Sequence, residues 1–264
     1  MEIVRTERKG FLMNCAAMKK ENAPTVWWQG NDGFLFSDGN RLIATDLDLF
    51  NPERKWAPTV DLEELCEALD WLFITHGHED HFNTATVEYL LKNGRCRFAI
   101  PQSCVEKALA IEGLTERSLF VSPGDSFQAD GISISCIRAV HGHIGGAVYS
   151  GASMLDCGYR FHLGGLCFYQ PGDTLLLEEH QSMQDIDVLF LSPTEHNTWI
   201  EGSKALIRMM QPRYVILQHH STYGEHSDNL FWSHGYVEEL LAALTEEERA
   251  RCIVPDPMRM IVLE

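Results

Sequence analysis

The sequence predicts a layered α/β fold in which helices pack on β-sheets. Apolar runs of strand length recur along the chain, and segments with helical spacing separate several of them. No apolar run reaches the roughly 18 residues that a membrane-spanning helix needs. At 264 residues and 45% hydrophobic content, the chain can bury a large core. We expect residues 25–264 to form this domain and residues 1–24 to form an N-terminal arm or edge segment.

The first half of the expected domain opens with an antiparallel meander, because turns rich in glycine, asparagine and aspartate separate its strands. Asn83 and Ser103 are typical helix N-caps, and Gly94 is a typical C-terminal residue. The predicted elements are strands at 25–29, 33–37 and 41–45, a helix at 61–69, a strand from 71, a helix at 84–92, a strand at 97–101 and a helix at 103–111.

The second half alternates strands and helices in the same way. The predicted elements are a strand at 132–137, a hairpin of 159–162 and 166–170, a strand at 187–192, a helix at 202–210, a strand at 214–218, a helix at 236–244 and a strand at 258–263. We interpret the acidic run 246–248 as a solvated face. No low-complexity linker divides the chain, so the two αβ halves should pack sheet to sheet as one αββα domain.

One motif is the main indication of a metal site in the sequence. The apolar strand at Trp71 ends in Thr75-His76-Gly77-His78-Glu79-Asp80-His81, which places three histidines and two carboxylates within six residues. A core cannot hold these groups uncompensated, and together they form the ligand set that suits Zn, Fe or Mn. His76 and His78 can converge on one ion, and Asp80 and His81 can face a second.

Three later strands also end in residues that can bind metal. His141 follows the strand at 132–137 and would complete the first ion's ligands, with His143 as a nearby substrate-side candidate. The Pro171-Gly172 turn delivers Asp173, which we expect to bind metal. The strand at 214–218 ends in His219 and His220; either could complete the second set, and we favour His219 as the first polar group after the strand.

Several other polar residues are candidates for catalysis or support. We expect Asp80 or a neighbouring histidine to pass a proton to a leaving group, and His220, His196 and Tyr223 to contact substrate or deliver protons. Asp46 ends the strand at 41–45. A plain turn residue is the commoner role for such an aspartate; the alternative is that it accepts the N–H of a ligand histidine and fixes its tautomer.

Composition limits the classes of partner. The formal net charge of −17 opposes binding to nucleic acid or to an anionic membrane and favours a small neutral or modestly charged substrate. The charged N-terminus lacks the apolar core of a signal peptide, so we expect a cytoplasmic location. The eight cysteines are scattered without a C-x-x-C pair, which favours free thiols. A homo-oligomer is compatible with the sequence.

Four segments together are similar to a known family: Thr75 to His81, then His141, then Gly172-Asp173-Thr174, and then His219. Through them the sequence resembles the metallo-β-lactamase superfamily over nearly the whole chain. Segments 26–30 and 218–220 are similar to its L-ascorbate 6-phosphate lactonase branch. The resemblance implies a four-layered αβ/βα sandwich and two divalent ions, with zinc or manganese expected. Matched motif by motif, the resemblance also implies that one ion is bound by His76, His78 and His141 and the other by Asp80, His81 and His219. It implies that Asp173 bridges the two ions.

The predicted function is therefore a metal-dependent hydrolase that uses a metal-activated hydroxide on a small lactone, ester or phosphoester. Gly-x-Ser-x-Gly and P-loop motifs are absent from the sequence, as expected if no serine nucleophile is needed. Two alternatives belong to other classes. One is a redox diiron protein, which shares this fold, and the other is a protein that binds metal or metabolite without turnover.

Overall fold

The first sheet combines antiparallel and parallel strands. The computed structural model of the protein describes residues 15–21, 23–224 and 236–264. The predicted meander is antiparallel, and the following strands run parallel to its last member. The order across the sheet is β16 (Met260–Val262), β1 (Thr25–Gly30), β2 (Gly33–Ser37), β3 (Leu42–Thr45), β4 (Trp71–Phe73), β5 (Arg97–Pro101) and β6 (Ser118–Val121).

The second sheet also has seven strands. Its order is β15 (Cys252–Ile253), β14 (Tyr214–Leu217), β13 (Val188–Leu191), β12 (Leu166–Gln170), β11 (Asp156–Leu163), β8 (Ile132–Ala139) and β7 (Ser126–Ala129). Strands β12 to β15 pair in parallel, and β11, β8 and β7 pair antiparallel. Outside both sheets, β9 (Gly142–His143) and β10 (Ala147–Val148) form a small antiparallel hairpin.

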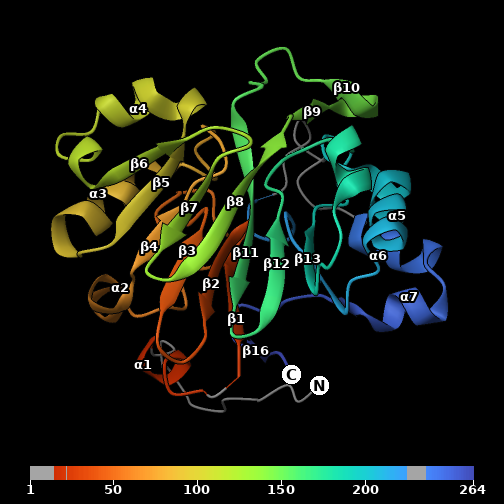
Figure 1. Cartoon of the computed structure of the whole chain (residues 1–264), viewed down its shortest axis with the longest axis horizontal. Coiled ribbons are helices and arrows are strands. Elements are labelled where there is room, and N and C mark those ends of the chain that lie inside the picture. Colours follow the sequence, from red (N-terminus) through yellow and green to blue (C-terminus); the bar gives the residue numbers. More distant parts are fainter. Residues whose placement is uncertain (1–14, 22, 225–235) are drawn as a thin grey trace.

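Helices cover the outer faces of the two sheets (Figure 1). On one side lie α1 (Cys15–Met18), α2 (Leu62–Ala68), α3 (Thr84–Asn93) and α4 (Val105–Leu109), and on the other lie α5 (Trp199–Met210), α6 (Tyr236–Ala243) and α7 (Glu246–Ala250). Three buried clusters fill the spaces between the layers: helix to sheet, sheet to sheet and sheet to helix. The predicted four-layered sandwich is therefore confirmed.

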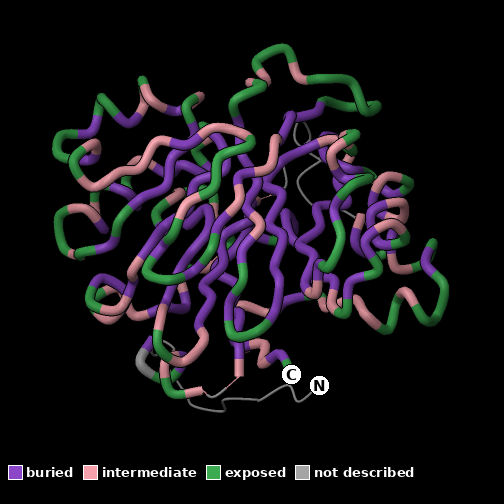
Figure 2. The backbone as a smooth tube through the Cα atoms, in the orientation of Figure 1, coloured by how far each residue is buried: buried purple, intermediate pink, exposed green. Residues whose placement is uncertain are grey.

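Aromatic side chains hold the two sheets together. Phe36 of the first sheet lies edge-on to Phe161, Phe168 and Phe190 of the second, with ring centroids 5.2, 5.8 and 5.4 Å apart. The strands that carry them are buried over most of their length, whereas exposed residues concentrate in the connections (Figure 2). This apolar interior fixes the positions of the strand ends that carry the polar residues described below.

Side-chain caps explain where several helices begin, but the predicted cap Ser103 is wrong: it lies inside the 3₁₀ turn 102–104, and α4 follows Cys104 without a side-chain cap. The side chain of Asp61 accepts the N–H groups of Glu63 and Glu64 at the start of α2, and Asn83 accepts the N–H of Thr86 in α3. The acidic run 246–248 belongs to a helix, α7, because Thr245 and Glu248 form a reciprocal capping box. A threonine followed three residues later by a glutamate is typical of a helix start, so this helix could have been predicted from the sequence.

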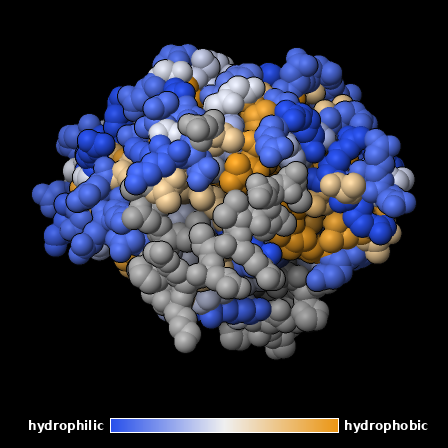
Figure 3. Space-filling model, turned by 90° about the horizontal axis from the view of Figure 1, so that it is seen from below, coloured by the Kyte–Doolittle hydropathy of each residue, from blue (hydrophilic) through white to orange (hydrophobic). Residues whose placement is uncertain are grey.

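Among the described residues, no helix combines the length and the apolar character needed to cross a bilayer. The face that Figure 3 shows, seen from below, exposes hydrophobic side chains beside the prevailing hydrophilic ones.

Candidate metal centre

Metal-capable side chains from both sheets meet at one edge of the sandwich. From the first sheet come Asp46, which follows β3, and the motif at 76–81, which follows β4. From the second sheet come four further residues, His141 after β8, Asp173 after β12, His196 after β13 and His219 after β14. Parallel strands end at the same edge of a sheet, which explains why residues so distant in sequence converge here.

The structure brings the first predicted ligand set together. The donor atoms of His76, His78 and His141 lie within 4.8 Å of one another. The Nε2 of His76 lies 3.1 Å from the Nδ1 of His78. The backbone carbonyl of Gly142 lies 2.6 Å from the Nδ1 of His141, so this nitrogen carries a proton and the Nε2 is the ring atom that faces the other donors.

The second predicted set also converges. Donor atoms of Asp80, His81 and His219 lie within 4.8 Å of one another. One oxygen of Asp80 lies 3.3 Å from the Nε2 of His81 and 3.8 Å from the Nε2 of His219. All three side chains are almost fully buried, so these polar atoms need a partner inside the protein.

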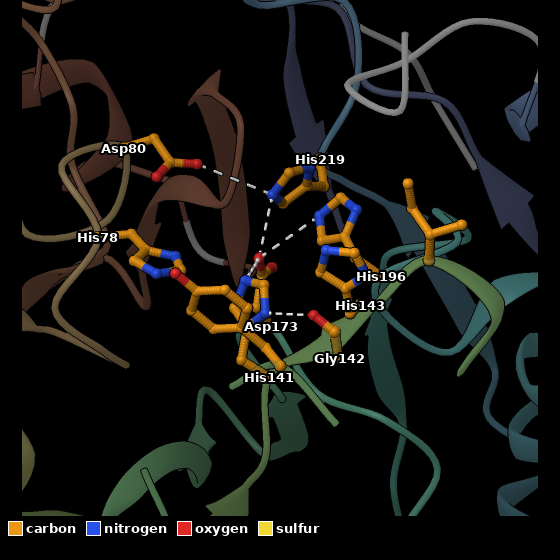
Figure 4. A pocket seen from close by; sticks show the side chains of 10 residues that line it. His78, Asp80, His141, Gly142, His143, Asp173, His196 and His219 are labelled. Carbon is orange, nitrogen blue, oxygen red and sulfur yellow. Dashed lines mark hydrogen bonds and ion pairs between the residues drawn. The ribbon is translucent and has the colours of Figure 1, made fainter. Parts of the chain in front are cut away.

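Asp173 lies between the two groups, as Figure 4 shows. Its Oδ2 is 3.1 Å from the Nε2 of His141 in the first group and 3.2 Å from the Nε2 of His219 in the second. Gly172 delivers it with a positive φ of 63°, and a Cβ at that glycine would lie 2.6 Å from the Cβ of Thr75. Only glycine therefore fits this crossing between the two sheets.

Asp46 supports the second group from behind. Its Oδ2 accepts the Nδ1–H of His81 at 2.9 Å, and its two oxygens also accept the N–H and hydroxyl of Thr75 at 2.8 and 2.6 Å. These bonds fix the His81 tautomer and direct its Nε2 toward Asp80 and Asp173. Of the two roles considered for Asp46, its contacts match the less common one, in which it accepts the N–H of a candidate ligand histidine. It is not a plain turn residue.

Two asparagines that were not predicted as site residues orient the carboxylates. Asn31, in the turn between β1 and β2, donates from Nδ2 to the Oδ2 of Asp80 at 3.0 Å. Asn197 donates from Nδ2 to the Oδ1 of Asp173 at 3.1 Å. Asn31 looks like an ordinary turn residue, and no local pattern in the sequence separates it from one. Asn197 stands next to His196, and that adjacency is the available signal.

Burial and the neighbouring carboxylates shift the pKa values of the candidate ligands in opposite directions. Burial lowers the pKa of His76 well below the usual value, so its imidazole is neutral. Burial acts likewise on His81, but nearby carboxylates, chiefly Asp80 and Asp173, outweigh it and raise the pKa of His81 well above 6.5. In His219 burial is again outweighed, chiefly by Asp173, and its pKa rises to about 9. A divalent ion bound here would compete with protons for the ring nitrogens of His81 and His219.

Four non-glycine residues in or next to the centre have a left-handed backbone conformation, and four others lie elsewhere in the described chain. Asn31, Asp46, His219 and Ser221 have φ values of 47°, 40°, 59° and 56°, in the left-handed region. Such conformations cost of order 1–3 kcal/mol each and recur at functional sites. The turn at His219 sends its side chain into the cluster directly after the buried strand β14.

A small cavity of about 230 Å³ opens over these donors. Its lining includes Asp80, Asp173 and His219, and two further candidates, His143 and His196. The Nε2 of His196 lies 3.7 Å from the Oδ2 of Asp173, and the donor atoms of His141, Asp173 and His196 also lie within 4.8 Å of one another. Burial lowers the pKa of His196 to about 3.

Two sequence candidates lie elsewhere. His220 does not line this cavity; its ring stacks on Trp28 at 4.9 Å and lines a separate cavity with Trp56. Tyr223 is buried and donates its hydroxyl to Asp48 at 2.6 Å. Of the adjacent pair of histidines, therefore, the structure brings His219 to the cluster and His220 to an aromatic contact.

The donor set fits a borderline divalent cation. It consists of imidazole nitrogens and carboxylate oxygens, which suit zinc, manganese or iron, and the candidate clusters among the described residues contain no thiolate. Within each group the donors are close enough for one cation to contact all three. Hydrogen bonds from Asn31 and Asn197 and to Asp46 orient the ligands, as in known metal sites.

Comparison with known proteins identifies the family of the chain. Residues 25–219 match the model of the β-lactamase superfamily domain. A UPF0173 metal-dependent hydrolase of Anaeromyxobacter sp. (strain K) is 26% identical, with 87% of this chain and 84% of the relative covered. Igni18, a metallo hydrolase from the archaeon Ignicoccus hospitalis, is 22% identical with a TM-score of 0.66, covering 92% of this chain and 99% of that one.

A further structural neighbour is CmlA, a diiron β-hydroxylase from Streptomyces venezuelae. It is 12% identical with a TM-score of 0.67, and the match covers 91% of this chain and 54% of CmlA.

The fold, the clustered donors and the family match define a metallo-β-lactamase-type protein, and the chain belongs to the β-lactamase superfamily. The prediction of a metal-dependent hydrolase of this superfamily is confirmed.

Proposed function

We propose that the protein holds two divalent ions, zinc or manganese, and hydrolyses a small-molecule ester, lactone or phosphoester. The observation that carries this proposal is the position of one Asp173 oxygen, 3.1 Å from His141 in one donor group and 3.2 Å from His219 in the other. A carboxylate shared in this way suits two neighbouring cations. The lactone is the finer expectation and rests on the likeness of segments 26–30 and 218–220 to the lactonase branch.

The residues would divide between the ions as the motif implies. One ion would be held by His76, His78 and His141, the other by Asp80, His81 and His219, and both by Asp173. When bound, the ions would lower the pKa of a coordinated water toward neutrality and polarise a carbonyl or phosphoryl oxygen of the substrate.

Two side chains face the cavity from opposite sides (Figure 4). Asp80 is held by the Nδ2 of Asn31, and we assign to it the delivery of a proton to the leaving group. His196 stacks on His141 with ring centroids 5.6 Å apart and borders the same space, and we assign to it a contact with the substrate. His220 is left out of the catalytic set because its ring packs on Trp28.

The test begins with metal analysis of protein purified without chelator. The metal-loaded protein is then assayed against a panel of lactones, carboxylic esters and phosphoesters. We expect hydrolysis of at least one class, and we expect it to be lost in the His76→Ala, His78→Ala double variant because two ligands are removed. His162→Ala, which changes an exposed histidine of β11, is the matched control and should keep both metal and activity.

Three results would contradict the proposal. The first is turnover that survives the double variant. The second is protein that contains iron, absorbs visible light and hydrolyses no member of the panel; that result would indicate the redox alternative. The third is bound metal or metabolite without any turnover, which would indicate the binding alternative.

A further inference from the structure

The hairpin of β9 and β10 borders the cavity and carries apolar residues on the surface. Gly142, His143, Ile144 and Tyr149 line the cavity, and Val148 pairs with Gly142 across the hairpin. Ile144 is 53% exposed and Val148 is 62% exposed. We call Ile144, Val148 and Tyr149 the hairpin surface.

Exposed apolar side chains occur on the hairpin and just after it. Of the ten large hydrophobic side chains that are exposed among the described residues, Ile144 and Val148 belong to the hairpin, whereas Met154 and Leu155, which follow it, line a separate cavity. Single exposed hydrophobic residues are normal on a protein, but a group of them beside a binding site indicates that something apolar covers them.

The base of the hairpin is fixed against the metal centre. The N–H of Gly142 donates to the carbonyl of His196 at 3.1 Å, and the N–H of Tyr149 donates to the carbonyl of His141 at 3.0 Å. The ring of Tyr149 lies 5.3 Å from that of His141 and 5.8 Å from that of His78. The hairpin surface is therefore adjacent to the candidate ligands His78 and His141, within reach of a molecule bound in the cavity.

The cavity offers little to an anionic substrate. Within the described part of the chain, its lining contains no lysine or arginine. Lys107 contacts the ligand loop, but its ammonium group is engaged by the carbonyl of Gly77 at 2.9 Å and by Glu79 at 2.8 Å. Protein sites for phosphate groups typically supply arginine, lysine or a helix N-terminus. The ions of the proposed site would themselves add positive charge at the reacting group, and the described lining supplies no cationic side chain beyond them.

The cavity is also small. Its volume of about 230 Å³ is below the roughly 300–1,000 Å³ of pockets that enclose drug-sized ligands. It can admit the reacting group and a few neighbouring atoms, and the remainder of a larger substrate would lie outside the cavity, whose wall includes Ile144 and Tyr149 of the hairpin surface.

We propose that the hairpin surface selects an uncharged ester or lactone whose apolar chain lies across Ile144 and Val148, in preference to a phosphoester. This inference rests on the proposed hydrolase function and narrows its substrate class. The hydrolysed bond lies in the cavity, and the apolar chain covers side chains that are otherwise in contact with water, which favours binding in proportion to the buried area.

The test compares p-nitrophenyl acetate, p-nitrophenyl octanoate and p-nitrophenyl phosphate with the metal-loaded full chain. We expect kcat/KM for the octanoate to exceed that for the acetate by about tenfold or more, and the phosphate to be the poorest substrate. In the Ile144→Ser, Val148→Ser double variant, the ratio of octanoate to acetate should fall about tenfold. Leu109→Ser is the matched control, because Leu109 of α4 is 66% exposed and does not line the cavity; its ratio should not change.

A second measurement separates this inference from the proposed function. Binding of the non-hydrolysable ketones 2-pentanone and 2-undecanone is measured by calorimetry, in the native protein and in the double variant. If neither these compounds nor any lactone, ester or phosphoester of the wider panel is hydrolysed, the proposed function fails and the ketones test the inference alone: tighter binding of the longer ketone, lost in the double variant, supports it. Equal binding of the two ketones, an unchanged ratio in the double variant, or preferred hydrolysis of the phosphate overturns it.

Discussion

Asp46 and His81 share a buried hydrogen bond of 2.9 Å between Oδ2 and Nδ1, although the residues are 35 positions apart in the sequence. The bond joins the end of β3 to the loop after β4 and determines which nitrogen of His81 faces the candidate metal centre. The geometry of one predicted ligand thus depends on a residue that does not itself reach the cavity.

The first prediction concerns this bond. Asp46→Asn keeps the shape of the side chain but removes the charge that orients the His81 imidazole. We expect divalent-metal affinity to fall by about 10–100-fold, as measured by competition with a chromophoric chelator. Asp70→Asn is the control, because Asp70 accepts the N–H of Leu42 outside the centre; equal losses in both variants would contradict the proposed role of Asp46.

The second prediction separates the adjacent histidines His219 and His220. His219→Ala should lower the metal content of the purified protein, because it removes a candidate ligand. His220→Ala should leave the metal content unchanged and reduce the free energy of unfolding by about 1–3 kcal/mol, because the stacking on Trp28 is lost. Elemental analysis and urea denaturation measure the two effects, and the reverse pattern would reassign the ligand to His220.

The third prediction concerns the glycine at the base of the hairpin. A Cβ at Gly142 would lie 2.5 Å from the carbonyl oxygen of His196 and 2.5 Å from Cδ2 of Leu175. Gly142→Ala should therefore reduce the free energy of unfolding by about 1–3 kcal/mol.

Gly77→Ala provides a matched control for Gly142→Ala. A Cβ at Gly77 would meet only the sulfur of Cys104, at an ordinary 3.5 Å, so its effect should stay within about 0.5 kcal/mol. Urea denaturation of both variants is the measurement. Equal free energies of unfolding for the two variants would contradict the prediction, because they would show that the backbone at Gly142 accommodates a Cβ without loss of stability.

The fourth prediction concerns pH and His180, which lies away from the metal centre. Its Nδ1 accepts the N–H of Leu177 at 3.0 Å, its Nε2 lies 2.9 Å from the hydroxyl of Tyr169, and burial lowers its pKa to about 4. The unfolded chain, with a pKa near 6.5, binds this proton more readily. Stability from His180 is therefore complete above about pH 6.5 and falls as the pH drops toward 4, by about 3 kcal/mol.

The measurement for His180 is a series of urea denaturations between pH 7 and pH 4. His180→Gln removes the titrating group and should reduce the pH dependence relative to the native protein. Tyr169→Phe removes the hydroxyl partner but keeps the imidazole, so it should lower stability while the pH dependence remains. An unchanged slope in His180→Gln would show that other groups control the acid sensitivity.

The candidate ligand motif, whose side chains converge in the structure, could be recognised in the sequence because its spacing is local. His76, His78 and His81 follow directly from an apolar strand, and His141, Asp173 and His219 follow later strands in the same way. The elements that place these residues were recognisable from apolar runs and caps such as Asn83, which accepts the N–H of Thr86. Local chemistry is sufficient for such features.

Other parts of the site depend on contacts between distant segments. Asn31 reaches Asp80 from a turn that looks ordinary in sequence, and Asn197 reaches Asp173 from the loop after a different strand. The short strands of the hairpin, at 142–143 and 147–148, contain too few residues to show an alternating pattern. The side on which His220 lies depends on Trp28, almost two hundred residues earlier, so no nearby residue could indicate it.

The candidate ligands are supplied by both sheets: His76, His78, Asp80 and His81 follow β4, whereas His141, Asp173 and His219 follow strands of the second sheet. Cations bound by these residues would link the two sheets. They would raise the free energy of unfolding as the free ion concentration rises above the dissociation constant. A low concentration of the ion in a cell would then have a second effect besides the loss of catalytic activity. It would also expose the polypeptide to proteases and reduce the amount that survives.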